Sequence, residues 1–164
     1  MTLGYYLSVT LHVLAALLWL GGMFFLAAVG APVLRAVEPP ALRQELFRRL
    51  GLKFRTLGWV AVAVLVTTGV INLHYRGWLS GAVLGSGAFW ATPVGHALAW
   101  KLAAVTAMIV ASAVHDFALG PAAGRAPVGS PEALRLRRRA ALVARTNALL
   151  GLIVVLAAVR LVRG

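Results

Sequence analysis

The sequence predicts an all-α integral membrane protein, a bundle of four transmembrane helices that forms a single membrane domain over residues 1–164. Hydrophobic residues make up 61% of the chain and charged residues 12%, whereas soluble domains are about half apolar and about a quarter charged. Several apolar stretches are long enough to cross a bilayer as helices. The alternation of polar and apolar residues that a β-barrel needs is absent from the sequence.

The spans follow from the apolar stretches and their flanking residues. The expected spans are about 4–34, 58–75, 93–119 and 140–159. The first stretch lacks a basic segment before it and a small-residue cleavage site after it, so we expect a retained span rather than a signal peptide. Leucine and phenylalanine recur at helical spacing among basic residues in segment 41–57, which predicts an amphipathic cytoplasmic helix at the membrane surface or running straight into the second span.

The charge of +12 is concentrated in two loops. Segments 35–55 and 118–145 each hold six of the sixteen basic residues. Basic loops mark the cytoplasmic side of a membrane protein, which predicts both termini on the outer (periplasmic) side of an inner (plasma) membrane. Anionic lipid headgroups are the expected partners of these loops, and nucleic acid is not expected. The absence of cysteine removes disulfides, thiolate metal sites and covalent c-type haem attachment.

Polar residues inside the spans are the candidate site. His12 is the one titratable group in the first apolar stretch, and an ionisable residue within a span suggests function. At a rise of about 1.5 Å per residue, His12 and Lys101 each lie roughly 12 Å below the outer boundary. His74 and His96 lie within about 5 Å of that boundary, whereas His115 lies roughly 33 Å down. We therefore expect an outer group around His12 and Lys101, with His115 apart from it.

Each candidate has more than one interpretation. His12 is either a ligand, with imidazole as the usual axial group for haem iron, or a neutral ring bonded to a hydroxyl or carbonyl of a neighbouring helix. Lys101 either extends to the surface, or pairs with a haem propionate, ligates iron as a neutral amine or passes protons. His74 and His96 are interfacial residues or candidates for a second axial bond. Trp19 packs in the core or stacks on a macrocycle. In the His115–Asp116 pair we expect the carboxylate to orient the ring.

Three segments carry a family resemblance. Residues 11–26 (LHVLAALLWLGGMFFL) place a histidine seven residues before Trp19, which is followed by glycines. This stretch is similar to the first helix of the CopD and HemJ superfamily of four-helix membrane proteins. Residues 54–73 (FRTLGWVAVAVLVTTGVINL) resemble its second helix, and residues 100–105 (WKLAAV) resemble the start of its third.

The resemblance implies a function. In HemJ-like proteins the first-helix histidine is implicated in binding haem b and the third-helix lysine is functionally important, roles that fall on His12 and Lys101. It implies a redox protein that transfers electrons or oxidises a quinol or porphyrinogen, and the enzyme would be a protoporphyrinogen oxidase. The alternatives are copper uptake or resistance of the CopD type, with His12, His74 and His96 as ligands, and an accessory subunit without a cofactor.

Two further observations bear on these alternatives. The soft ligands that copper prefers are few, since the chain has no cysteine and three methionines (Met1, Met23 and Met108). On this ground the sequence favours haem b over copper. Small-residue faces at Gly21, Gly22 and Ala28 allow close self-association, so a homo-oligomer is compatible with the sequence. A quinol, a porphyrinogen or a redox protein is the expected partner.

Overall fold

The computed structural model describes residues 2–127 and 129–163, with side chains described up to residue 160. All regular secondary structure in the described residues is helical, as predicted. Four long helical segments and two short helices follow one another along the chain: α1 (Leu3–Phe25), η1 (Leu26–Gly30) and α2 (Ala31–Arg35); α3 (Pro40–Tyr75); α4 (Gly81–Leu84) and α5 (Gly87–Trp90); α6 (Pro93–Ala113), η2 (Val114–Leu119) and α7 (Gly120–Arg125); and α8 (Pro131–Arg163).

The four long segments are the predicted membrane spans. Leu3–Arg35, Pro40–Tyr75, Pro93–Arg125 and Pro131–Arg160 are each long and apolar enough to cross a membrane, with mean hydropathies of 1.8 to 2.2. Because isolated apolar helices of this length are stable in lipid, where their backbone bonds are satisfied internally, the chain is a multi-pass membrane protein.

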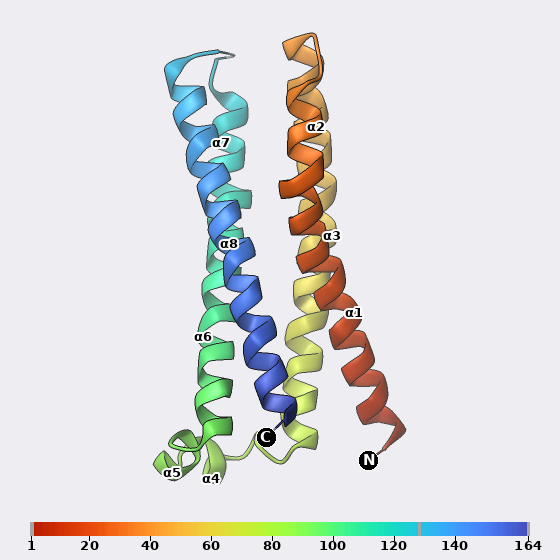
Figure 1. Ribbon diagram of the computed structural model, residues 1–164, viewed down its shortest axis with the longest axis vertical. Helices are drawn as coiled ribbons and strands as arrows, with labels where there is room; N and C mark the ends of the chain where they lie inside the picture. Colours follow the sequence, from red (N-terminus) through yellow and green to blue (C-terminus); the bar gives the residue numbers. More distant parts are fainter. Residues whose placement is uncertain (1, 128, 164) are drawn as a thin grey trace.

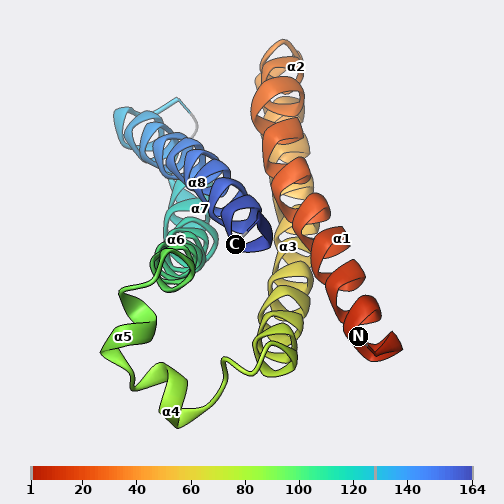
Figure 2. The ribbon, with the colours of Figure 1, turned by 60° about the horizontal axis from the view of Figure 1, so that its bottom comes forward.

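The bundle consists of two antiparallel hairpins. α1 packs along α3, and α6 packs along α8. The hairpins meet where α8 contacts α1, and Figure 1 shows α8 crossing toward the α1–α3 pair. In Figure 2, α3 and α6 diverge, and the segment with α4 and α5 connects them. The two hairpins therefore touch over only part of their length.

The two ends of the bundle differ. The α2–α3 and α7–α8 connections share one end, here called the basic end, while the start of α1, the end of α8 and the short helices α4 and α5 share the other, here called the terminal end (Figure 1). Both termini thus lie on one side, as predicted. Their position outside the cell remains a prediction from the charge pattern.

The predicted amphipathic segment 41–57 is the N-terminal half of α3. This helix has 36 residues, which corresponds to about 54 Å at 1.5 Å per residue, whereas the hydrocarbon layer is about 30 Å thick. α3 therefore extends well beyond the bilayer at the basic end. Glu45 on this extension pairs with Arg48 at 2.7 Å and with Arg49 at 2.6 Å, one turn along the same helix.

The apolar core lies midway along the bundle. Trp19, Ala61, Val62 and Met108 are its buried members, from three different helices. Trp19 lies against Gly58, where an added Cβ would be 3.6 Å from the Trp19 ring. The structure thus places Trp19 in the core between helices, which is the packing interpretation of this residue.

Candidate functional site

His12 lies at the interface of α1 with α3. Its Nδ1 is 2.8 Å from the Thr68 hydroxyl oxygen, and that hydroxyl donates its own proton to the Val64 carbonyl at 2.6 Å. Since a threonine hydroxyl has one proton to donate, it accepts from His12, and Nδ1 carries the ring proton. Nε2 is then the basic nitrogen of the imidazole, and a backbone hydrogen bond with Leu65, one turn before Thr68 on α3, also holds the ring.

Polar side chains continue along this interface toward the terminal end. Ser8, one turn before His12, donates to the Thr68 carbonyl at 3.4 Å. Asn72, one turn after Thr68, has a buried Oδ1 without a hydrogen-bond partner among the described residues. We call Ser8, His12, Thr68 and Asn72 the polar ladder. It creates a polar strip in an otherwise apolar interface, near the predicted depth of His12.

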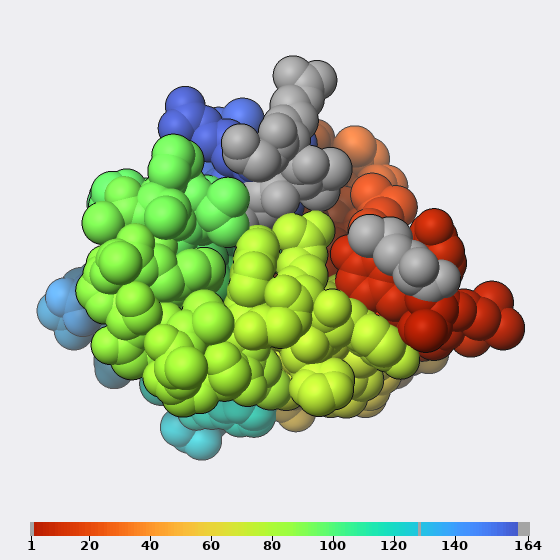
Figure 3. Space-filling model, turned by 90° about the horizontal axis from the view of Figure 1, so that it is seen from below, coloured from red at the N-terminus to blue at the C-terminus, as the bar shows by residue number. Residues whose placement is uncertain are grey.

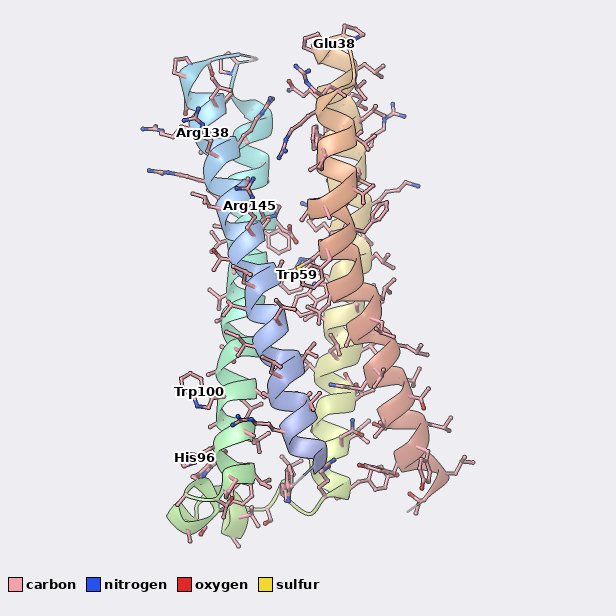
Figure 4. The ribbon with its side chains drawn as sticks, viewed as in Figure 1. Glu38, Trp59, His96, Trp100, Arg138 and Arg145 are labelled. Carbon is pink, nitrogen blue, oxygen red and sulfur yellow. The ribbon has the colours of Figure 1, made fainter. Side chains whose placement is uncertain are left out.

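Lys101 faces this region from α6. Its ammonium group lies within electrostatic range of the His12 ring, and Arg76 lies within range of Lys101. The two residues that the sequence placed at one depth are thus near each other in space. The four acidic residues of the chain, Glu38, Glu45, Asp116 and Glu132, all belong to the half of the bundle nearer the basic end. Figure 4 labels Glu38 at that end.

The other two outer histidines lie apart from the ladder. His74 is exposed and makes an edge contact with Tyr75, with ring centroids 6.1 Å apart. His96 is exposed and points away from the bundle on the same face of α6 as Trp100 (Figure 4). The structure does not bring either of them to His12, and no group of three or more histidine, aspartate or glutamate side chains within 2–127 and 129–160 could hold a metal ion.

The His115–Asp116 pair forms a separate polar cluster toward the basic end. His115 Nδ1 is 2.9 Å from Asp116 Oδ1, so the carboxylate orients the ring as predicted. Trp59 of α3 donates to Asp116 Oδ2 at 3.0 Å, and Arg55 donates to the Asp116 carbonyl at 3.4 Å. These bonds connect the two hairpins. The sequence analysis did not predict these bonds, because no pattern in the sequence pairs Trp59 of α3 with Asp116 of η2, 57 residues apart.

A second polar contact between helices was also missed. Asn147 of α8 is buried and donates to the Ser112 hydroxyl at 2.9 Å and to the Met23 sulfur at 3.6 Å. The signal that could have indicated it is the position of an asparagine in the middle of an apolar span. Such residues commonly bond across helices in membrane bundles.

These features define the class of protein as a four-span membrane protein with a histidine-containing polar ladder inside its bundle. Residues 48–161 match the family model described as "Copper resistance protein D", and the chain belongs to this CopD family. The resemblance predicted from the sequence is therefore confirmed. The matched region contains Lys101, His74 and His96 but begins after His12, so the family match does not extend to the first helix.

One curated relative is similar to part of the chain. It is a protein of Aquifex aeolicus (strain VF5) named "Uncharacterized protein", 38% identical over 65 residues. The aligned region covers 39% of this chain and 44% of the relative, so the chain spans less than half the length of that protein. No solved structure matches the chain.

Proposed function

We propose that this protein handles copper in the membrane, and that His12 is the ligand that receives the ion between the helices. The family supports copper more than the haem b interpretation that the sequence favoured. The observation that carries the proposal is the position of the His12 ring: it is half-buried between α1 and α3, and the Thr68 hydroxyl holds Nδ1, which leaves Nε2 as the basic nitrogen.

The Thr68 contact is what a ligating histidine needs. Imidazole suits copper, and a ligating ring usually donates its other N–H to a second group, which fixes its tautomer and orientation. In this protein the Thr68 hydroxyl accepts the hydrogen bond from the ring and donates its own proton in a hydrogen bond to the Val64 carbonyl. The ring is therefore oriented before any ion arrives. Gly69 leaves space beside it, since an added Cβ there would lie 3.6 Å from the His12 ring.

A cavity lies at the terminal end of the bundle, one turn beyond the ladder. A shallow cavity of about 510 Å³ lies there, lined by Thr2, Tyr5, Tyr75, Arg76 and Trp78. Tyr5 and Tyr75 stand one turn beyond the ladder residues of their helices. Figure 3 views this end and shows side chains of the segment after α3 covering the space toward α6. The ladder residues themselves do not line this cavity, so an ion that enters it would still have to pass Tyr5 and Tyr75.

Metal binding to the purified protein tests the proposal. We expect copper to bind the detergent-solubilised protein, and the variant His12→Ala to lose at least tenfold in affinity in a competition with a chelator. His96→Ala is the matched control, because that histidine is exposed and points away from the bundle. Equal copper affinity of His12→Ala and the unmodified protein would refute the role of His12.

Haem b is the second candidate for the same residue, and the position of Lys101 favours it. A lysine ammonium near His12 opposes a metal cation but attracts the propionates of a porphyrin. The residues around His12 fit haem b in part. His12 would supply one axial nitrogen and Lys101 a cation, whereas His74 and His96 lie too far from His12 to be assigned a second axial bond. When bound, haem would supply one-electron chemistry, for electron transfer or for oxidation of a quinol or porphyrinogen.

Replacing Lys101 distinguishes the two candidates. If His12 binds copper, Lys101→Gln leaves copper affinity unchanged or raises it, because a repelling charge is removed. If His12 binds haem b, the same variant weakens haem binding, measured by the Soret absorption of protein titrated with haemin. If the unmodified protein binds neither copper nor haem, that result would favour a cofactor-free accessory subunit, alone or as a homo-oligomer.

The basic end supplies a further partner. We propose that Arg48, Arg49, Lys53 and Arg55 on the extension of α3, with the arginines at the start of α8, contact anionic lipid headgroups of the inner membrane. Their clustering beside two spans supports this, since juxtamembrane basic residues each contribute about 1 kcal/mol near an anionic surface. Binding to vesicles with and without anionic lipid tests it. We expect salt to weaken it.

A further inference from the structure

The centre of the bundle holds an amide oxygen without a partner. Asn147 of α8 is 4% exposed. Its Nδ2 donates to Ser112 and to the Met23 sulfur, whereas its Oδ1 is buried and forms no hydrogen bond with any residue that the structure describes. Burying a polar group without a partner is unfavourable, so this oxygen indicates that something else occupies the position.

Two methionines lie on the same side of α8 as Asn147. Met23 of α1 contacts Asn147 directly, with its sulfur 3.6 Å from Nδ2. Met108 of α6 is 1% exposed and reaches α8 one turn further along, at Gly151, where an added Cβ would meet the Leu20 side chain first and the Met108 methyl carbon at 3.5 Å. Met23 also packs against the core cluster that contains Met108. Both methionines of the described chain therefore converge on the Asn147–Gly151 face.

We propose that Met23, Met108 and Asn147 form a mid-membrane site for a soft monovalent cation, Cu(I). Thioether sulfur selects Cu(I) among the biological metals, and the long flexible methionine side chain adapts to a nearby ion. The unpartnered Asn147 oxygen completes a set of three neutral ligands from three helices. The inference rests on the proposed copper function but uses no residue of the polar ladder.

The ligand set indicates a site of passage rather than storage. Its members carry no charge, so a bound ion keeps its full positive charge and is held less firmly than by thiolates or carboxylates. Met23 is eleven residues after His12, about 16 Å further along α1 at 1.5 Å per residue. The site therefore lies deeper than the ladder, on the other side of Trp19. The small number of methionines therefore argues less strongly against copper than the sequence suggested, since Met23 and Met108 both lie near Asn147 and Gly151.

Methionine methyl signals provide the test. The chain has three methionines, so protein labelled with [methyl-¹³C]methionine gives three signals, assigned with Met23→Leu and Met108→Leu. Silver ion is the probe, as a redox-inert substitute for Cu(I). We expect the Met23 and Met108 signals to shift together and to saturate at one silver per chain. The signal of Met1, which lies outside the described residues, stays unchanged.

The variants separate this site from the His12 site. Met23→Leu keeps a side chain of similar volume and should weaken silver binding at Met108 at least tenfold, as should Asn147→Leu. His12→Ala should leave both methyl shifts intact even where it abolishes binding at the ladder. Helical circular dichroism confirms that each variant is folded. Unshifted Met23 and Met108 signals, or full silver binding in Met23→Leu, would overturn the proposal and leave Asn147 as an interhelical bond with an internal water.

Discussion

Replacing Thr68 by valine tests whether the His12 ring is prepared for a ligand. Valine has nearly the same shape but cannot accept a hydrogen bond from Nδ1, which lies 2.8 Å from the Thr68 hydroxyl oxygen. Loss of such an outer partner typically weakens metal binding about 10- to 100-fold, which corresponds to about 1.4 to 2.7 kcal/mol. An interhelical hydrogen bond stabilises a membrane bundle by about 0.6 kcal/mol on average. The loss of affinity should therefore exceed the loss of fold stability.

The assay compares affinity and stability in the same preparations. Copper or haemin affinity is measured by competition, and thermal unfolding is followed by circular dichroism in detergent. Thr67→Val is the matched control, since Thr67 is adjacent on α3 but exposed. We expect Thr67→Val to bind as the unmodified protein does. An affinity of Thr68→Val within twofold of the unmodified protein, or an equal effect of Thr67→Val, would refute the orienting role of Thr68.

Substitutions at three further positions, Gly95, Met108 and Asp116, test the packing around the site. Gly95→Ala should destabilise the fold by about 1–3 kcal/mol in thermal unfolding, because an added Cβ meets backbone atoms of α5, whereas Gly87→Ala, with open space around it, should not. Met108→Ala should cost about 2–5 kcal/mol, and Met108→Leu under about 1.5 kcal/mol; equal losses would contradict the packing described for this side chain. Asp116→Ala should lower the free energy of unfolding by about 0.6–1.7 kcal/mol. It should also shift the fluorescence emission of Trp59, which loses its hydrogen bond to the carboxylate; the spectrum of Trp59→Phe identifies that residue's contribution.

Much of the fold was predictable because the bilayer imposes it. A helix is the one open-ended element that satisfies its backbone in lipid, so apolar length alone located the four spans. The boundaries were less predictable. α3 begins at Pro40, in agreement with the helix expected over 41–57, and α8 begins at Pro131; both start ahead of the lipid-crossing spans expected from about 58 and 140. Hydropathy marks where a helix enters the lipid, whereas hydrogen bonding and proline at the first turn decide where it begins.

The sequence predicted the depth of the site residues in the membrane but not the helix face on which each of them lies. Counting residues placed His12 and Lys101 at one level, and the structure brings them within electrostatic range. Which face of a helix a residue occupies depends on how the helices pack, and nearly uniform apolar sequences carry little of that information. For this reason the sequence could not exclude His96 from the ladder, nor could it join Asp116 to Trp59 or Asn147 to Met23.

The distribution of polar groups also limits how an ion could cross. The polar ladder and the methionine site are separated by Trp19, Ala61 and Val62, which form one apolar core cluster with Met108. On α1, residues 13–22 between them contain no charged or hydroxyl side chain, and a permanent water-filled pore needs polar groups along its wall. Under the proposed function, an ion that leaves His12 would reach Met23 only when core side chains or the hairpins move, because interiors packed in this way leave few voids large enough for water. Passage would then be stepwise and slow, as in a carrier.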